Sequence, residues 1–191
     1  MVLLSAFALL TSSTLVEAQK PRAERPTYTL GERWSRSDGV YDLIRVEDGR
    51  YIFAAGVDRQ IHLTEDLMLA KVQKGKWVME FTPPPMLTWP LEVGKWGTSS
   101  GIWRIPTVPG GESADFNWSV QAYEDVQVLA GTFKAFRISL PINFTYQYGR
   151  YGGSMRAALQ PRQLVTWYAP EARQFVKAEG FGMDLLAFRR P

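Results

Sequence analysis

The chain has 191 residues, of which 46% are hydrophobic and 13% aromatic, and its formal net charge is +3. This composition excludes a disordered protein, and the scattered basic residues exclude an extended nucleic-acid-binding surface. The sequence contains no cysteine. Disulfides, thiolate metal sites, cysteine nucleophiles and a lipid-modified cysteine are therefore excluded as well.

Residues 1–18 have the pattern of a secretory signal peptide. The apolar run VLLSAFALL is followed by TSSTLVEA, in which Val16 and Ala18 fit the −3 and −1 positions of a cleavage site. No lysine or arginine precedes the apolar run, so the amino terminus supplies the positive charge there. The run is too short to span a bilayer. We expect cleavage after Ala18, no transmembrane segment in the mature chain, and a periplasmic or secreted location, with the lack of disulfides favouring a bacterial periplasm.

The next segment, residues 19–27, contains the charged tract KPRAERP and is expected to form a solvated linker. Residues 28–191 are then expected to form a single all-β domain. Asp38-Gly39 and Asp48-Gly49 separate segments rich in β-branched and aromatic residues, which is a strong hairpin signal.

Short strands continue through the middle of the chain. We expect strands at residues 60–63, 67–73 and 76–81, with a turn at Lys74-Gly75, although residues 64–71 also allow an amphipathic helix. The three consecutive prolines at 83–85 lack the N–H groups of a sheet ladder, so this part is expected to be a crossing or an edge.

The second half alternates more regularly. In DFNWSVQAY, Phe116, Trp118 and Val120 share one face, and the polar residues between them share the other. INFTYQY alternates in the same way, and QLVTWYAPEARQFVKAEG predicts a hairpin that turns at residues 170–172. The fold class predicted is all-β: an antiparallel curved sheet, open barrel or sandwich of about ten strands.

The segment VLAGTFKAFRI is expected to turn at Ala130-Gly131 and to continue as a strand over residues 132–140. Phe133 and Phe136 lie on opposite faces of this strand by alternation. Large aromatic residues on both faces are typical of a central strand between two layers.

Three motifs resemble a group of exported bacterial β-domains of unknown function. Pro90, Leu91, Gly94 and Trp96 follow its Pro-Leu-x-x-Gly-x-x-Trp pattern, except that a single residue separates Gly94 from Trp96. The Ala-Gly-Thr-Phe strand start and the Trp-Tyr-Ala-Pro hairpin fall at residues 130–133 and 167–170. The resemblance covers most of residues 28–180. It implies a curved antiparallel sheet or open barrel in the bacterial envelope, and it implies no catalytic residue.

Catalytic and metal-binding patterns are not found in the sequence. His62 is the only histidine, which disfavours a histidine triad or a multi-histidine metal site, and we expect it to be a surface or capping residue. Glu65-Asp66 and Glu124-Asp125 are adjacent carboxylate pairs, and neighbours in a strand point to opposite faces. We therefore predict a protein that is not an enzyme, with no catalytic residue, no metal and no cofactor.

The aromatic side chains on apolar faces are the remaining functional signal. They are expected either to fill a core or to line a cavity for a lipid-like or other apolar small molecule. The candidate ligand-binding residues are Phe116, Trp118, Phe136, Tyr146, Tyr148 and Trp167. Lys134 and Arg137 are weaker candidates for contact with an anionic head group.

Three classes of function remain open at this stage. The first is a periplasmic or secreted domain that binds an apolar or amphiphilic ligand on its concave face. The second is an envelope interaction module that contacts a glycan or a protein partner through an exposed edge or aromatic patch. The third, and the least favoured, is a hydrolase that uses scattered carboxylates.

Overall fold

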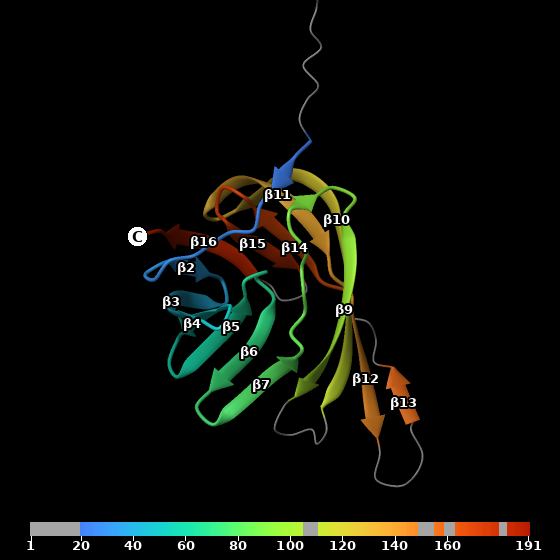
Figure 1. The fold of residues 1–191 in the computed structure, drawn as a ribbon. Coiled ribbons are helices and arrows are strands. Elements are labelled where there is room, and N and C mark those ends of the chain that lie inside the picture. The colour runs from blue at the N-terminus through green and yellow to red at the C-terminus, as the bar shows by residue number, and fades with distance from the viewer. Residues whose placement is uncertain (1–19, 105–110, 149–154, 159–162, 180–182) are drawn as a thin grey trace, which may run out of the picture.

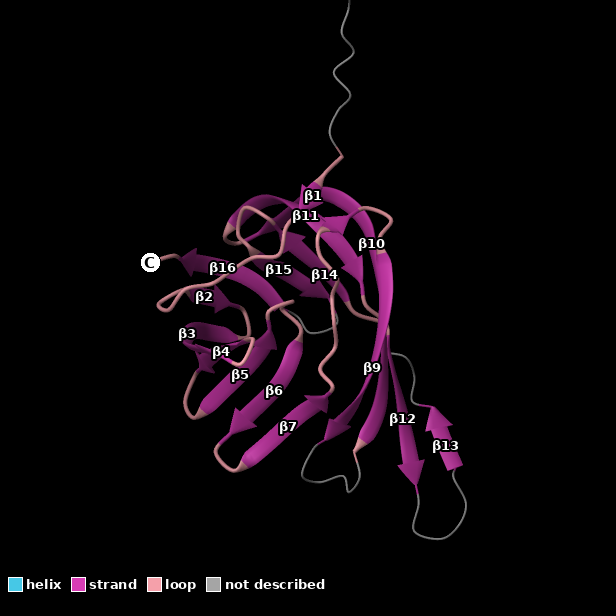
Figure 2. Ribbon diagram, in the orientation of Figure 1, coloured by secondary structure: helices cyan, strands magenta, loops and turns pink. Residues whose placement is uncertain are grey.

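The computed structural model describes residues 20–104, 111–148, 155–158, 163–179 and 183–191, so the predicted signal peptide lies outside the described residues. The described part forms strands and no helix (Figures 1 and 2). The strands are β1 (Arg22–Ala23), β2 (Arg33–Arg36), β3 (Gly39–Glu47), β4 (Arg50–Ala55), β5 (Arg59–Thr64), β6 (Leu69–Lys74), β7 (Trp77–Thr82), β8 (Leu91–Glu92), β9 (Trp96–Arg104), β10 (Glu112–Val128), β11 (Gly131–Ser139), β12 (Ile142–Tyr148), β13 (Met155–Ala158), β14 (Val165–Ala169), β15 (Gln174–Glu179) and β16 (Met183–Arg189).

Twelve of the described strands close into an antiparallel barrel. Their order around the ring is β11, β14, β15, β16, β2, β3, β4, β5, β6, β7, β9 and β10, and pairing of β10 with β11 closes it. Figure 1 shows the ring with β2 to β7 on one side and β9 to β11 on the other. Closure removes the unpaired edges that an open sheet would expose.

Strand β10 is the longest described strand and belongs to two pairings at once. Its first part, from Glu112 to Phe116, pairs with β9 on one side and β12 on the other. Its second part, from Ser119 to Val128, pairs with β11. The hairpin of β12 and β13 therefore continues the sheet outside the ring, and it extends away from the barrel in Figure 1.

The tight turns follow the local sequence. Asp48 and Gly49 both have positive φ angles, 50° and 67°, as expected of the two central residues of a type I′ hairpin turn. These values explain why an Asp-Gly pair occupies the position, because glycine accepts this conformation without strain and aspartate tolerates it.

The proline-rich segment at residues 83–90 crosses from β7 to β8 and passes close against β9. A Cβ atom at Gly101 would lie 2.4 Å from the backbone oxygen of Pro83, so only glycine fits there. Pro85 and Leu87 of the crossing segment are buried. The segment then ends in β8, which pairs with β1. The predicted crossing is confirmed.

The N-terminal segment is attached to the barrel. Strand β1 lies within residues 19–27, the segment predicted as a linker, and Ala23 is buried in its pairing with β8. Further on, the hydroxyl of Tyr28 donates a hydrogen bond to the backbone oxygen of Arg173. The Arg173 guanidinium in turn lies 2.9 Å from the buried carboxylate of Glu32. These contacts hold the start of the domain against the turn between β14 and β15.

The structure confirms the all-β antiparallel prediction and resolves the alternatives left open. The sheet is a closed barrel with twelve strands in the ring, compared with the roughly ten strands expected from the spacing of the turn signals. The strands predicted at 60–63, 67–73 and 76–81 correspond to β5, β6 and β7, so the helical alternative is wrong. The hairpin predicted around residues 170–172 joins β14 and β15.

Candidate ligand-binding cavity

Side chains of the barrel interior, together with Ile142 and Phe144 at the start of β12, border a partly open apolar cavity of about 360 Å³. This volume lies within the range of pockets that bind small organic ligands, roughly 300–1,000 Å³. Apolar side chains from both halves of the ring line most of it, and Arg36 and Thr166 are its polar lining residues. The lining comprises Arg36, Leu63, Leu67, Met68, Leu69, Met79, Phe81, Pro85, Leu87, Trp103, Phe116, Trp118, Ile138, Leu140, Ile142, Phe144, Leu164, Thr166, Phe175, Ala178 and Met183.

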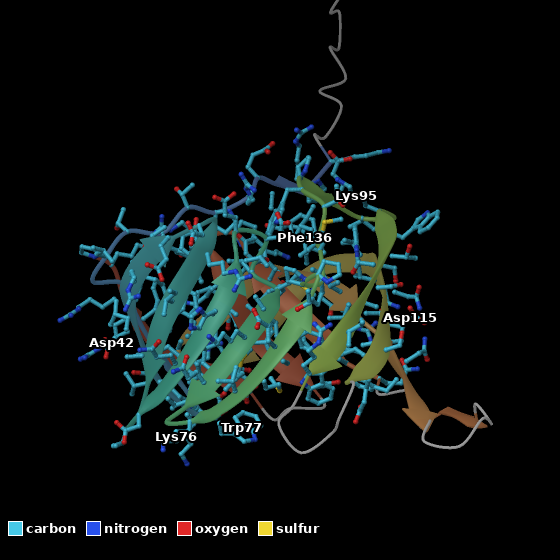
Figure 3. The ribbon with its side chains drawn as sticks, turned by 60° about the horizontal axis from the view of Figure 1, so that its bottom comes forward. Asp42, Lys76, Trp77, Lys95, Asp115 and Phe136 are labelled. Atoms are coloured by element: carbon cyan, nitrogen blue, oxygen red, sulfur yellow. The ribbon has the colours of Figure 1, made fainter. Side chains whose placement is uncertain are left out.

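Alternation along the strands builds this wall. On β10, Ala114, Phe116, Trp118 and Val120 are buried, whereas Asp115 between them is exposed and points outward in Figure 3. The same period of two directs Phe81 inward from β7. Since each strand contributes its apolar face, the interior is hydrophobic by construction.

The polar end of the cavity is formed by Arg36 of β2. Its guanidinium carbon lies 4.8 Å from the ring centre of Trp34 and 4.9 Å from that of Tyr41, so the charge stacks on two aromatic rings. Burial lowers the pKa of Arg36 from its usual value, and the charges of Tyr41 and Asp38 oppose this effect. An arginine stays protonated under such conditions, so a cation borders an apolar space.

Several hydrogen-bond donors around this end have no acceptor. The Arg36 Nη2 atom lies 3.5 Å from Oε1 of Gln174, at the limit of a hydrogen bond. Within the described structure, Nε of Arg36 and Nε2 of Gln174 are buried without any partner. Gln174 is 0% exposed, which makes its free amide costly unless something else accepts from it.

A further orphaned donor lies across the barrel. Trp103 of β9 lines the cavity, and its indole Nε1 is buried without a partner among the described residues. Strands β2 and β9 are six positions apart around the ring in either direction. The cavity therefore has polar atoms near two opposite walls and apolar surface between them.

The six sequence-predicted ligand residues are divided by the structure. Phe116 and Trp118 line the cavity. Phe136 is fully buried, and its ring packs 4.6 Å from that of Tyr123, so it belongs to the core beside the cavity (Figure 3). The side chains of Tyr146 and Tyr148 lie outside the described part of the structure.

Trp167 is buried but does not line the cavity. Its Nε1 atom donates a hydrogen bond to Glu124 over 2.8 Å, and Lys177 and Arg137 lie over its ring. Lys134, the other cation considered for an anionic head group, is exposed and pairs with Asp125. The cation that borders the cavity is instead Arg36, which the sequence reasoning missed. The available signal was its position two residues after the buried Trp34, on the same face of β2.

The other candidate groups are placed as follows. His62 is 9% exposed, and its Nε2 has no partner within the described residues, so the expectation of a surface histidine is wrong. Burial and the neighbouring cations Lys71 and Arg50 lower the pKa of His62. Glu47 and Glu80 act weakly in the opposite direction.

The adjacent carboxylates are engaged in ion pairs and hydrogen bonds. Glu65 and Asp66 occupy a turn, and both approach Nη1 of Arg25, at 2.9 and 3.7 Å. The argument from strand alternation therefore does not apply to this pair. Glu124 and Asp125 do lie on a strand. Glu124 accepts a hydrogen bond from Trp167, and Asp125 forms an ion pair with Lys134.

No cluster of three or more potential metal-binding side chains occurs in the described ranges. The same ranges contain no helix of sufficient length and hydrophobicity to cross a membrane.

Comparison with known proteins gives a likeness in fold. No protein-family model and no curated protein sequence matches the chain. The crystal structure of the hypothetical lipoprotein YmcC from Escherichia coli K12 superposes with a TM-score of 0.51 at 11% sequence identity. The superposition covers 84% of this chain and 84% of the lipoprotein. At this identity, the likeness shows that the two chains share an all-β fold.

Proposed function

We propose that the protein is a non-enzymatic β-domain of the bacterial envelope that binds an apolar or amphiphilic small molecule inside its barrel. The observation that carries the proposal is the cavity of about 360 Å³ with its almost entirely apolar lining. Protein interiors are normally close-packed, and an unfilled space loses the dispersion contacts of its walls. An occupant would restore those contacts.

The energetic argument favours an aliphatic ligand. Each methylene group that leaves water for an apolar site contributes about 0.8 kcal/mol. About ten methylenes therefore contribute roughly 8 kcal/mol, the free energy of micromolar binding before the cost of immobilisation is subtracted, so a long chain is favoured over a short one.

The envelope location is supported by three separate observations. The sequence pattern at residues 1–18 is that of a signal peptide. The three motifs resemble exported bacterial β-domains. A solved structure with the same fold is described as a hypothetical lipoprotein. This chain has no cysteine to carry a lipid, so we propose a free periplasmic or secreted form.

Filling the cavity tests the proposal. Ala178 lines it from β15 and is 5% exposed, so Ala178→Phe places a ring in the space. We expect the wild type to bind the uncharged fluorophore N-phenyl-1-naphthylamine, and Ala178→Phe to bind it at least about tenfold more weakly. Fluorescence titration measures both affinities. Ala187→Phe is the matched control, because Ala187 is exposed on β16.

A wild-type protein that does not bind the probe would contradict the proposal and favour an envelope interaction module. Equal affinity of the wild type and Ala178→Phe would show that the probe binds elsewhere. Native mass spectrometry of the mature protein, purified from its own host, complements the titration, because a retained adduct of lipid-like mass identifies the occupant directly.

A further inference from the structure

The polar end of the cavity has more hydrogen-bond donors than acceptors. Buried Nε of Arg36 and buried Nε2 of Gln174 have no acceptor in the described structure, and the two side chains are neighbours, 3.5 Å apart at Nη2 and Oε1. Arg36 lines the cavity, and the completely buried Gln174 lies beside Arg36 without being one of the lining residues. Water does not satisfy these two buried donors as it satisfies donors at the surface, so the missing acceptor indicates a place for a ligand atom.

The positive charge at this end also lacks an ion-pair partner. Among the described residues, no carboxylate oxygen lies within 4.0 Å of the Arg36 guanidinium, whereas ten other ion pairs satisfy that limit. Asp38 acts on Arg36 electrostatically, but its Oδ2 atom accepts a hydrogen bond from the Tyr41 hydroxyl. A charge at a largely apolar site is stabilised best by an opposite charge that also accepts hydrogen bonds.

From this arrangement we propose that the cavity's occupant is an amphiphile with an anionic oxygen head group, bound by Arg36 and Gln174, and an aliphatic tail. The inference rests on the proposed function, since it specifies the ligand of the same cavity. A carboxylate or a phosphate supplies acceptors without donors, which complements a guanidinium fork and an amide N–H. A neutral head group can accept hydrogen bonds from these donors but leaves the Arg36 charge without a counter-charge, and a cationic head group is repelled by it.

The rest of the wall fits the tail. Away from Arg36, the lining is apolar except for Thr166, and it consists mainly of Leu, Met, Ile, Phe and Trp side chains from strands on both sides of the ring, from the start of β12 and from the connecting segments. A tail that extends from the head group at β2 crosses towards the opposite wall at β9. The head group alone would leave this apolar surface empty, so a small free anion does not account for the site.

The test compares ligands that share one chain and differ in the head group. Isothermal titration calorimetry of the wild type uses dodecanoate, dodecyl phosphate and the neutral 1-dodecanol, all below their aggregation concentrations, with acetate as the anion without a tail. We expect dodecanoate or dodecyl phosphate to bind about tenfold or more tightly than dodecanol, and acetate not to compete. Whichever anion binds more tightly identifies the head group.

Arg36→Met removes the charge while keeping an apolar side chain of similar length. We expect it to lose the preference for the anionic ligand and to keep the wild-type affinity for dodecanol. Arg33→Met is the matched control, because Arg33 lies on the same strand but is exposed and pairs with Asp42 on the outer surface. Gln174→Met should weaken the preference partly, and it tests the same end of the cavity if Arg36→Met does not fold.

The outcomes separate the two proposals. If the wild type binds neither the anionic ligands nor dodecanol, the proposed function itself is overturned. If it binds dodecanol and both anions with equal affinity, the cavity binds apolar ligands but the head-group inference is overturned. Displacement of dodecanoate by acetate at comparable concentration also overturns the inference, because the tail would then contribute nothing.

Discussion

At the scale of single residues, polar groups inside the protein distinguish this chain most clearly from a simple packed core. Phe116 and Trp118 could be assigned to the interior from alternation alone, since each is flanked by polar residues. Trp167 could not be assigned, because alternation indicates which residues share a face but not what covers that face. Its face is covered by Lys177, Arg137 and Glu124, all three of them polar.

Arg36 could not be assigned to the interior from the sequence, because a charged residue is normally expected at the surface. A charged residue two positions after a buried tryptophan breaks the apolar pattern, and without the fold it reads as a solvated end of a strand. Only the pairing of β2 with β16, far away in the sequence, brings Arg36 next to β15 and Gln174. Buried polar residues of this kind are therefore the least predictable part of a site.

The environment of His62 predicts a pH dependence of stability. Burial lowers its pKa in the folded protein, so the unfolded chain binds the proton more readily. The free energy of unfolding should therefore be constant above about pH 6.5, the ordinary value for histidine, and fall as the pH drops below it. In His62→Gln this decrease between about pH 7 and pH 5 should be smaller.

Urea denaturation at a series of pH values measures this difference. His62 is the only histidine in the sequence, so no other imidazole contributes in that range. An identical pH profile for the wild type and His62→Gln would show that the folded and unfolded states bind the His62 proton equally.

At the scale of elements, the hairpins could be predicted and the long-range pairings could not. The Asp48-Gly49 turn and the β14–β15 turn depend on local conformation, which the sequence specifies directly. The pairing of β7 with β9 bypasses the proline-rich segment and β8, and no local signal encodes it. The double role of β10 is likewise a property of its neighbours and not of its own alternating pattern.

The close approach of β9 to the crossing segment should make Gly101 intolerant of a larger side chain. Gly101→Ala places a methyl group against the Pro83 backbone oxygen, so either β9 or the segment must move. We expect a loss of roughly 1–3 kcal/mol in the free energy of unfolding, the usual cost of overpacking. Because Pro85 and Leu87 line the cavity, the affinity for an apolar probe should change as well.

Thr98→Ala on the same strand is the control, since Thr98 is exposed. Chemical denaturation of the wild type and the two variants, followed by tryptophan fluorescence, gives the comparison. If Gly101→Ala is no less stable than Thr98→Ala, the packing of the crossing segment on β9 is looser than the geometry indicates.

At the scale of the whole molecule, the sequence predicted the all-β fold class but not the closure of the sheet into a barrel. Composition and alternation lead to an antiparallel all-β fold, and a flat, open or closed arrangement satisfies them equally well. Closure depends on the pairings of β10 with β11 and of β16 with β2. The ladders that involve β3, β10, β14 and β16 contain register shifts of the kind that β-bulges produce. Such shifts bend the strands and help the sheet to curve into a barrel.

The ring should not be equally stable around its circumference. Between β15 and β16 the described ladder consists of the pairs Lys177–Asp184 and Ala178–Met183, whereas β10 and β11 pair from Ser119–Ser139 to Val128–Gly131. We expect the amides of β15 and β16 at this seam to exchange hydrogen faster than those of the β10–β11 ladder, because fewer cooperative bonds hold them. Hydrogen–deuterium exchange with mass spectrometry measures the order of opening.

Bound dodecanoate should slow exchange at the seam, because Ala178 on β15 and Met183 on β16, which pair with each other there, both line the cavity. Uniform exchange around the ring would show that the barrel opens as a single cooperative unit.

The adjacency of β2 and β16 also has a consequence for biosynthesis. The two strands are separated by almost the whole described domain in sequence, yet they share one ladder. Before residues 183–189 have been synthesised or exported, β2 lacks its partner strand on one side and exposes a row of unpaired backbone N–H and C=O groups. Such an edge can pair with strands of other molecules. Strand β16 therefore protects β2 from intermolecular pairing, and a molecule truncated before Met183 should accumulate in inclusion bodies or be degraded.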